Sequence, residues 1–467
     1  MNISSVRRLT RQTLLSLCLV LTQTSLSAQS PNLPDLVLPV MHKAGAILSV
    51  KPDRANWIYP LGAPASFRIA FDLSPYPAGG VPIRYRLGPD MREGAELEAI
   101  VPAEGLNLHI AAQKVPGFVR CLVSAQLDGR TLTALATAGF APERIKATQS
   151  DPADFDEFWS RQKDALAKVP LDLQLVPAPE LSNAKVEAFY LSFQNVGNWA
   201  GHSRFYGVLA MPRTSAEHPG PFPALLNVPG AGVRPYRGNL VLAERGFITL
   251  QVGIHGIPVN LPPEVYEQLA RGALSEYQRN QLDDRDAYYY RRVYLGVLRA
   301  TEVLADQAKW DGKTLIVSGG SQGGQLSLVA AVLNPKVSAV AVDFPAYSDV
   351  SGYWHGSTGG WPGLFRTSAS GRMSDTPAEP KLTTSRYYDS VNFARRLTVP
   401  GHYTWGFNDM VTPPTSLHAA YNEITAPKRL VIAPDMAHST SNVQFTLRTN
   451  WMLQQAGLTH RLTPHTP

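Results

Sequence analysis

The chain has 467 residues but only two cysteines, Cys18 and Cys121. Cys18 lies in an N-terminal segment with the pattern of a secretory signal peptide, so the mature chain keeps one cysteine and forms no intrachain disulfide. Charged residues are also few, 17% against 44% hydrophobic residues, which excludes a disordered chain and indicates a globular one. Lysine and arginine form no cluster interleaved with aromatic residues, so we expect no nucleic-acid partner.

The first 28 residues carry the features of a cleaved signal peptide. Arg7, Arg8 and Arg11 precede a short apolar stretch, and small residues end at Ala28. Without these three arginines, which no acidic residue offsets, the formal net charge falls from +6 to +3. The apolar stretch is too short for a membrane-spanning helix, so we expect no membrane span. We therefore expect an exported protein, located in the periplasm or outside the cell.

The length predicts more than one domain, and the pattern changes near residue 142. Within residues 29–142, apolar and polar residues alternate with a period of two over residues 67–73, as in a half-buried strand. Asp128-Gly129 between two apolar runs predicts a hairpin. Further strands are expected over residues 83–87, 106–112, 118–127 and 131–139. These strands predict a small β-sandwich-like domain. A packing or spacer role is the simpler interpretation, and carbohydrate binding is the alternative.

Residues 143–467 alternate short apolar runs with helix-length stretches. Such alternation predicts a mainly parallel sheet with helices on both faces. The expected strands cover residues 224–228, 247–252, 314–318, 338–343, 397–404 and 429–433, and the clearest helices residues 287–308 and 322–332. Residues 186–193 and 205–211 predict an antiparallel pair at the leading edge of the sheet.

The most informative motif is Gly319-Gly320-Ser321-Gln322-Gly323, between a predicted strand and a predicted helix. Gly-x-Ser-x-Gly in this context is the nucleophile elbow of the α/β-hydrolase fold. Glycines flank the serine because the turn is too tight for neighbouring side chains. The simpler alternative is a glycine-rich turn whose serine only caps the helix.

A serine nucleophile needs a base that an acid orients, and in this fold the chain order is serine, acid, histidine. Asp409 follows the strand predicted to end at Thr404, and His438 follows the strand predicted to end at Ala433. Both therefore lie where the carboxyl ends of strands meet at one edge of the sheet. Asp435 and Asp349 are rival acids that we rank below Asp409.

The tetrahedral intermediate of such a reaction needs two N–H donors for its oxyanion. The first is the N–H of Gln322, the residue after the serine. The second is expected from the glycine-rich loop after the strand at residues 224–228, where we select Ala231. A plain glycine turn is the alternative for that loop.

Residues 150–454 resemble the cephalosporin C deacetylase and acetyl xylan esterase family, carbohydrate esterase family seven. The resemblance rests on the segment 152–159, the Gly-x-Ser-Gln-Gly motif, the segment 409–414 with the helix after it, and His438. It implies a serine esterase with the triad Ser321, Asp409 and His438. The chain departs from the family pattern at His438-Ser439, His255-Gly256-Ile257 and Pro229-Gly230-Ala231.

Aromatic residues gather after the sixth strand of the second domain, among them Tyr353, Trp354 and Trp361. Such rings can stack on sugar faces, although aromatic residues also serve as core anchors. His255 is a further candidate for the substrate pocket. The sequence has no metal-ligand spacing and no dinucleotide glycine fingerprint in the required context, so we expect neither a metal nor a cofactor.

These observations predict an exported serine esterase that deacetylates carbohydrates, acetylated xylan or xylo-oligosaccharides, through an acetyl-enzyme. One alternative is another serine hydrolase, an esterase for longer acyl chains or a peptidase, which would share the triad. A second alternative is a non-catalytic carbohydrate-binding protein with a hydrolase fold. A homo-oligomer stays open. The resemblance does not carry the family's usual hexamer over to this chain, because the chain departs from the family pattern and the added N-terminal domain could block that assembly.

Overall fold

The computed structural model of the protein describes residues 34–40, 46–197, 201–216, 219–366 and 378–463. The predicted signal peptide, residues 1–28, lies outside the described residues and stays a prediction. Within the described ranges, no helix combines the length and the apolar character that crossing a bilayer requires.

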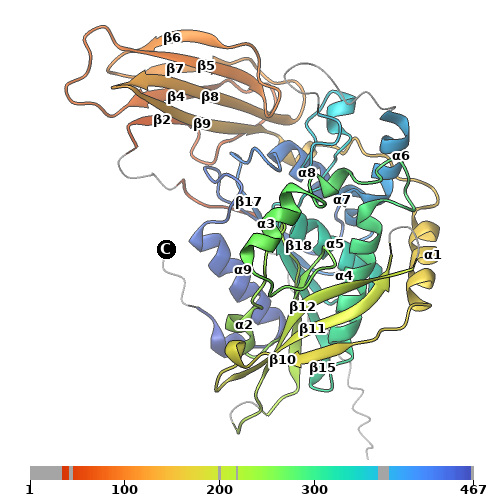
Figure 1. The fold of residues 1–467 in the computed structure, drawn as a ribbon. Helices are drawn as coiled ribbons and strands as arrows, with labels where there is room; N and C mark the ends of the chain where they lie inside the picture. The colour runs from red at the N-terminus through yellow and green to blue at the C-terminus, as the bar shows by residue number, and fades with distance from the viewer. Residues whose placement is uncertain (1–33, 41–45, 198–200, 217–218, 367–377, 464–467) are drawn as a thin grey trace, which may run out of the picture. The chain divides into compact units, whose positions relative to one another are not determined.

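The largest feature is a ten-stranded sheet with the order β1-β18-β17-β16-β15-β13-β14-β12-β11-β10 (Figure 1). Neighbouring strands from β1 to β14 run parallel, and β12, β11 and β10 continue the sheet antiparallel. The strands are β1 Leu36–Val37, β10 Gln174–Pro177, β11 Val186–Val196, β12 His202–Pro212, β13 Phe222–Asn227, β14 Ile248–Gly253, β15 Trp310–Gly320, β16 Ala339–Asp343, β17 Gly401–Trp405 and β18 Lys428–Ile432. The predicted parallel sheet and its antiparallel pair are therefore confirmed.

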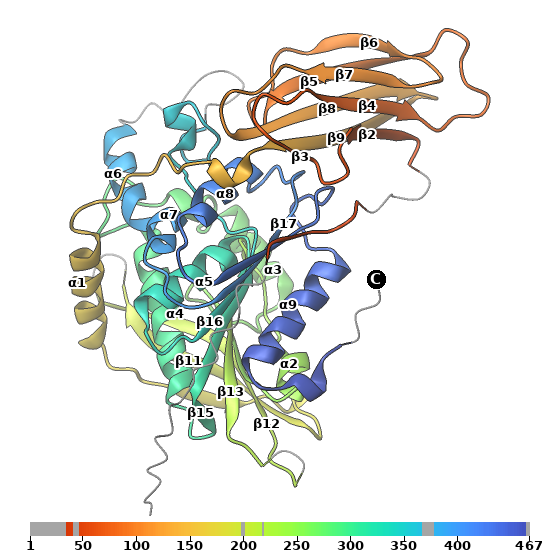
Figure 2. The ribbon, with the colours of Figure 1, turned by 180° about the vertical axis from the view of Figure 1, so that it is seen from behind.

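Helices cover both faces of this sheet (Figure 2). On one face α2 and α9 pack against strand residues such as Leu225 and Ile316. On the other face α1, α4 and α5 pack against the alternate residues, such as Leu226 and Val317. Successive side chains of a strand point to opposite faces of the sheet. Because helices cover both faces here, the side chains on both faces are apolar. The helices are α1 Phe155–Ala167, α2 Leu240–Glu244, α3 Pro263–Arg271, α4 Tyr289–Ala305, α5 Gln322–Leu333, α6 Ala378–Tyr388, α7 Ser390–Ala394, α8 Pro414–Asn422 and α9 Asn442–Gln455.

The β-rich N-terminal part consists of two further sheets, with the orders β2-β4-β7 and β3-β9-β8-β5-β6 (Figure 1). The strands are β2 Leu48–Pro52, β3 Ile58–Tyr59, β4 Ala65–Phe71, β5 Val81–Pro89, β6 Leu97–Val101, β7 Leu106–Ile110, β8 Gly117–Leu127 and β9 Arg130–Phe140. Asp128 and Gly129 join β8 to β9 with φ angles of 49° and 73°. Two positive φ values are the mark of a type I′ turn, so the predicted hairpin is confirmed.

Leu36 and Val37 fall within the range predicted for the β-rich domain, yet β1 pairs in parallel with β18 of the large sheet. The N–H of Leu38 also donates to the carbonyl oxygen of Ile432 at 2.7 Å. Without β1, the backbone groups of β18 would form an open edge, which proteins usually cover. Contacts join residues Asn32–Pro467 into one compact unit. The predicted boundary at residue 142 therefore stays a prediction.

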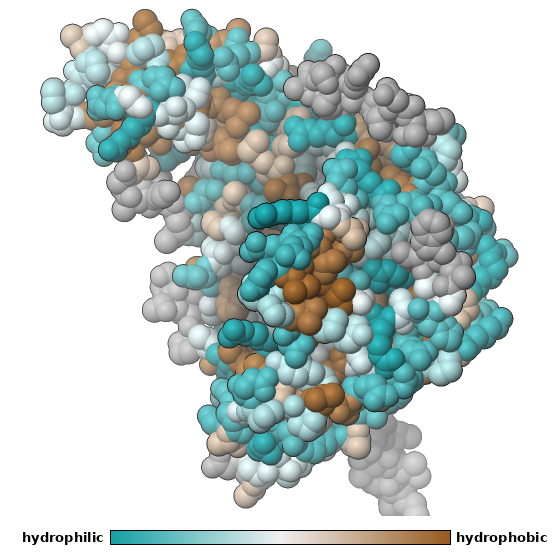
Figure 3. Space-filling view, viewed as in Figure 1, coloured by the Kyte–Doolittle hydropathy of each residue, from teal (hydrophilic) through white to brown (hydrophobic). Residues whose placement is uncertain are grey.

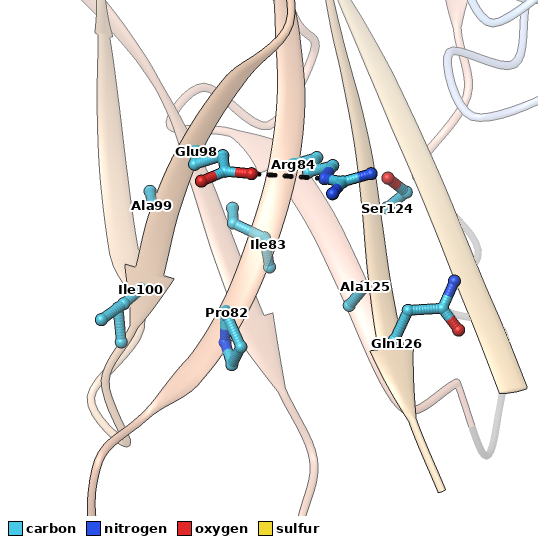
Figure 4. Close-up of a pocket in the computed structure, with 9 residues that line it drawn as sticks. All are labelled: Pro82, Ile83, Arg84, Glu98, Ala99, Ile100, Ser124, Ala125 and Gln126. Carbon is cyan, nitrogen blue, oxygen red and sulfur yellow. Dashed lines mark ion pairs between the residues drawn. The ribbon is translucent and has the colours of Figure 1, made fainter. Parts of the chain in front are cut away.

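A pocket of about 570 Å³ lies on the β-rich part, lined by residues of the neighbouring strands β6, β5 and β8 (Figure 4). Arg84 and Glu98 face one another at its wall, with 3.4 Å between Nε and Oε1. Its lining residues are Pro82, Ile83, Arg84, Glu98, Ala99, Ile100, Ser124, Ala125 and Gln126. Because this set holds no aromatic ring, it does not supply the stacking surface expected of a sugar site. On the face seen in Figure 3, apolar residues form several separate patches among hydrophilic ones.

One buried histidine of the large sheet makes the stability of the fold sensitive to acid. His402 on β17 is fully buried, and neither ring nitrogen has a hydrogen-bond partner among the described residues. Burial, helped by the charge of Arg429, lowers its pKa to about 3. The folded protein therefore keeps the ring neutral, whereas the unfolded chain binds a proton below about pH 6.5. The stability that His402 contributes is present above that pH and is lost as the pH falls towards 3.

His402→Met should weaken this acid sensitivity, because methionine has a similar size and takes up no proton. Between pH 7 and pH 5, we expect the melting temperature of the variant to fall less than that of the unchanged protein. A difference of one bound proton changes the free energy of unfolding by about 1.4 kcal/mol per pH unit, which a thermal melt detects. His109→Met, at a less buried position on β7, serves as the control. Equal falls for the His402 variant and the unchanged protein would contradict the expectation.

Candidate active site

Ser321 lies between the end of β15 at Gly320 and the start of α5 at Gln322. Its φ and ψ angles are 58° and −124°, a conformation that residues other than glycine rarely adopt. A Cβ on Gly319 would lie 2.6 Å from the carbonyl oxygen of Val228, and a Cβ on Gly323 would lie 2.4 Å from the same oxygen. Both positions therefore require glycine. The strand, the turn and the helix predicted around the serine are all present.

The structure brings together the three residues predicted as a triad. Nε2 of His438 lies 3.0 Å from Oγ of Ser321, and Nδ1 lies 2.7 Å from Oδ2 of Asp409. An ionised carboxylate only accepts hydrogen bonds, so Nδ1 carries the proton and Nε2 is left to accept from the serine hydroxyl. The side chain of His438 is 25% exposed and that of Asp409 is 0% exposed. The imidazole is thus open to a substrate, whereas its carboxylate partner is closed to water.

The buried carboxylate of Asp409 is fully hydrogen-bonded. Oδ1 accepts from the N–H groups of Val411 and Thr412 at 2.7 and 2.9 Å, and Oδ2 accepts from the Thr412 hydroxyl at 2.8 Å. Together with His438, these donors compensate the loss of water that burial of a charge entails. Thr412 is a hydrogen-bond partner of this carboxylate that the sequence analysis did not single out, although it belongs to the motif that begins at Asp409.

The rival acids have other surroundings. Asp349 is buried, and its Oδ1 accepts from the N–H groups of Thr148 and Gln149 at 2.9 and 2.8 Å. Asp435 precedes His438 on the same loop, where its carbonyl oxygen accepts from the side chain of Asn408 at 3.2 Å. The carboxylate at Nδ1 of His438 is that of Asp409.

Phe344 is a neighbour of the histidine that the sequence reasoning missed. Its ring centroid lies 4.5 Å from that of His438, with an angle of 51° between the planes. Phe344 directly follows β16, so it comes from the same edge of the sheet as the three residues predicted as a triad. A signal was available, because every strand end at this edge delivers its next residues to the site.

The two segments predicted to bind an oxyanion lie beside the serine. Gln322 is the first residue of α5, where a helix leaves its N–H groups without an intrahelical acceptor. The loop after β13 also lies near the serine, because a Cβ on Gly230 would lie 3.9 Å from Cβ of Ser321. That the N–H groups of Gln322 and Ala231 act as the donors stays a prediction.

The side chain of Gln322 ties the helix to this loop. It is fully buried, and its Oε1 accepts from the hydroxyls of Tyr277 and Tyr290, each at 2.7 Å. Its Nε2 donates to the carbonyl oxygen of Pro229 at 3.2 Å. The sequence analysis missed both tyrosines. Only Tyr290 had a signal, because it belongs to the run Tyr288-Tyr289-Tyr290 at the start of α4, an unusual concentration of hydroxyl donors.

His255, predicted as a substrate contact, lies behind the loop and is 8% exposed. Nε2 is 3.1 Å from the carbonyl oxygen of Gly232, and Nδ1 is 2.7 Å from the hydroxyl of Tyr289. Burial lowers the pKa of His255 to about 4, so the ring is neutral at pH 7. In this position His255 can hold the backbone of the loop at Gly232.

The aromatic residues after β16 differ in exposure. Trp354, in the short helix η4 Gly352–His355, is 45% exposed, which is high for a tryptophan. Tyr353 is partly buried, and burial raises its pKa to about 12. Trp361 packs edge-on against Tyr347, with 5.8 Å between the ring centroids. Trp354 therefore has the most surface to offer a ligand.

Comparison with known proteins agrees with this geometry. Residues 143–455 match the acetyl xylan esterase (AXE1) family. Acetyl esterase Axe7A of Xylanibacter ruminicola is 34% identical over 421 residues, which are 89% of this chain and 92% of that protein. The match to Axe7A exceeds the length of residues 143–467, so it extends into the β-rich part.

Two solved structures share the fold of the large sheet. Acetyl xylan esterase 1 from Thermoanaerobacterium sp. JW/SL YS485 has a TM-score of 0.56 and 24% identity over 67% of this chain and 97% of that one. The acetyl xylan esterase from Paenibacillus sp. R4 has a TM-score of 0.55 and 23% identity over 67% of this chain and 98% of that one. The large sheet with its helices thus has the α/β-hydrolase fold, and the chain is a carboxylic ester hydrolase that belongs to the acetyl xylan esterase family.

Proposed function

We propose that the protein is an exported serine esterase that removes acetyl groups from the hydroxyls of carbohydrates, acetylated xylan or xylo-oligosaccharides. The observation that carries the proposal is the chain of contacts from Oγ of Ser321 through His438 to Asp409, at 3.0 and 2.7 Å. Membership of the family and the likeness to acetyl esterase Axe7A support the acetyl group as the acyl part. Export rests on the signal-peptide pattern of residues 1–28.

In the acylation half of the reaction, Oγ of Ser321 attacks the acetyl carbonyl carbon while Nε2 of His438 takes the hydroxyl proton. The tetrahedral intermediate carries a negative oxygen and collapses by breaking the bond between the carbonyl carbon and the sugar oxygen. Nε2 returns its proton to that oxygen, so the sugar leaves as an alcohol. Asp409 keeps the proton on Nδ1 and stabilises the imidazolium that forms in between.

In the deacylation half, water attacks the acetyl group on Ser321, and Nε2 of His438 takes a proton from the water. The second tetrahedral intermediate releases acetate, and the proton returns to Oγ of the serine. The 25% exposure of His438 supports access of water to the ring at this stage.

The N–H groups of Gln322 and Ala231 are proposed to hold the negative oxygen of both intermediates. Their contribution is large, because loss of one such donor typically reduces the rate about a hundred- to a thousandfold. Two features support this role: a Cβ on Gly230 of the glycine-rich loop would lie 3.9 Å from Cβ of Ser321, and the buried Gln322 side chain ties α5 to that loop. The neutral His255 also helps to hold this loop, through the contact of its Nε2 with the carbonyl oxygen of Gly232.

The sugar part of the substrate is proposed to contact Trp354, with Tyr353 and Trp361 shaping the same segment. The exposed ring of Trp354 offers the flat apolar surface on which a pyranose stacks.

Release of acetate should be measured with acetylated xylan, other acetylated glycans and cephalosporin C, next to p-nitrophenyl acetate and octanoate and a peptide panel. We expect acetate from acetylated xylan or its oligosaccharides, and at least about tenfold higher kcat/KM for the acetyl than for the octanoyl ester, because one extra methylene changes discrimination by roughly 1–3 kcal/mol. Preference for octanoate would favour a long-chain esterase. Cleavage of peptides would favour a peptidase, and glycan binding without turnover would favour a binding protein.

A further inference from the structure

We propose that the β-rich N-terminal part positions the acid of the triad for catalysis: Arg120 and Asp90 hold the two ends of the loop that carries Asp409. The inference rests on the proposed function, since it concerns the acid of the proposed triad. It goes beyond that function because it assigns positioning residues to a part of the chain that holds no triad residue.

Arg120 on β8 grips the first end of the loop. Its side chain is 0% exposed, and Nη2 donates to the carbonyl oxygens of Asp409 at 2.8 Å and Phe407 at 3.3 Å. The guanidinium is itself fixed by the β-rich part, because Nε donates to the hydroxyl of Thr137 at 2.9 Å and Nη1 lies 3.7 Å from Oε1 of Glu93. A rigid, planar donor thus reaches the backbone of the acid itself.

Asp90, at the loop after β5, grips the other end. It is 1% exposed, and its carboxylate accepts from the N–H of Thr415 at 3.2 Å and from the hydroxyl of Thr415 at 2.6 Å. Thr415 lies in the first turn of α8, and Pro413 before that helix makes no side-chain cap. Asp90 therefore supplies, from the β-rich part, the acceptor that an N-terminal turn needs.

The β-rich part makes further contacts with the loop and with α8. The ring of Phe118 lies 5.0 Å from that of Phe407 and 5.1 Å from that of His418. The side chain of Asn408 donates to the carbonyl oxygen of Leu135 on β9 at 3.3 Å. Residues 407 and 408 thus contact the β-rich part, and so does the backbone of Asp409, whose carboxylate meets His438.

This arrangement matters for catalysis because the hydrogen bond between Asp409 and His438 depends on where the loop lies. Displacing a catalytic group by about 1 Å can reduce the rate about a hundredfold. The donors on the Asp409 carboxylate, Val411 and Thr412, belong to the same loop and would move with it. From outside the loop, the contacts of the β-rich part act together with the segment that leads to His438, where the N–H groups of Phe407 and Asn408 donate to the carbonyl oxygens of Pro434 and Met436, each at 3.1 Å.

Arg120→Met and Arg120→Lys in the full chain test the inference, with Arg299→Met as the matched control. Arg299 on α4 is likewise buried, 5% exposed, and donates to two carbonyl oxygens, those of Leu166 at 2.7 Å and Gln194 at 3.0 Å. Hydrolysis of p-nitrophenyl acetate is measured well below the melting temperature of each variant. We expect kcat to fall about ten- to a hundredfold in Arg120→Met with KM within about twofold, a partial rescue in Arg120→Lys, and a fall of less than threefold in Arg299→Met.

The pH dependence of kcat/KM separates positioning from general destabilisation. A carboxylate that moves away from His438 lowers the apparent pKa of the acid limb, whereas loss of a nearby positive charge alone would raise it. We expect a downward shift in Arg120→Met and none in Arg299→Met. If Arg120→Met does not fold, the same measurements on Arg120→Lys and Asp90→Asn decide, with a several-fold fall in kcat expected for each.

Equal kcat values for the Arg120 and Arg299 variants, or an acid limb that stays or moves upward, would overturn the inference. Ser321→Ala is measured alongside to keep two failures apart. Activity that survives in Ser321→Ala counts against the proposed function itself. Activity lost in Ser321→Ala but kept in Arg120→Met counts only against the role of the β-rich part.

Discussion

Ser321→Ala should abolish hydrolysis of p-nitrophenyl acetate, leaving less than about one part in 10⁵ of kcat. The reason is that a triad acts as a unit, so loss of the nucleophile removes nearly everything that the histidine and the acid contribute, roughly 10⁶-fold in kcat. The substitution removes one oxygen atom from a partly exposed side chain, so the fold and the melting temperature should change little. Steady-state kinetics with active-site titration measures the residual rate.

Ser327→Ala provides the control, since Ser327 lies on the same helix with its hydroxyl bonded to the carbonyl oxygen of Gly323 at 2.8 Å. That variant should keep kcat within about threefold. A burst of p-nitrophenol in the unchanged protein, absent from Ser321→Ala, would further support the acetyl-enzyme. Comparable turnover in Ser321→Ala and the unchanged protein would exclude this serine as the nucleophile and with it the proposed mechanism.

Asp409→Asn should reduce kcat roughly 10⁴-fold, as the corresponding change does in a serine protease triad. The amide oxygen can still accept from the N–H groups of Val411 and Thr412, so the loop should keep its shape. The amide nitrogen then faces Nδ1 of His438 in place of Oδ2, and it donates where the carboxylate accepted. The imidazole is forced to carry its proton on Nε2, where it cannot accept from the serine.

Asp349→Asn is the informative comparison, because Asp349 is the buried rival acid whose Oδ1 is engaged by Thr148 and Gln149. We expect it to lower the melting temperature while kcat stays within about fivefold. Kinetics above pH 9 add a second readout. If Asp409→Asn is inactive because His438 carries its proton on Nε2, raising the pH should restore part of its activity. A larger loss in Asp349→Asn than in Asp409→Asn would reverse the two assignments.

The elbow, the alternation of strands and helices, and the order of the three candidate residues along the chain could be predicted because each depends on neighbours in the sequence. Glycine is required at positions 319 and 323 because a Cβ there would clash with the carbonyl oxygen of Val228. Asp128-Gly129 suits a turn with two positive φ angles. The helix and the strands follow from apolar spacing over a few residues. The carboxyl ends of parallel strands meet at one edge, so Asp409 and His438 could be brought to Ser321 without coordinates.

Other features of the fold and the site have no local signal in the sequence. His255 could be singled out near the loop, but its burial behind Gly232 depends on Tyr289 from a distant helix. The grip of Tyr277 and Tyr290 on Gln322 joins segments that are 45 and 32 residues apart. Leu36 and Val37 join the large sheet through β18, almost four hundred residues further along the chain.

The sequence by itself determined the α/β-hydrolase part, the β-rich part and the residues proposed for the chemistry, because backbone geometry and hydrophobic periodicity are local properties. Only the tertiary structure decided that Arg120 and Asp90 reach the loop of Asp409, across 289 and 325 residues. From the sequence alone, an arginine in a strand is expected to be exposed. The acceptors that Arg120 finds on the loop are the backbone carbonyl oxygens of Phe407 and Asp409, and every residue has such an oxygen. Hydrogen bonds to the backbone carry no residue-specific signal, so their partners emerge only when the chain has folded.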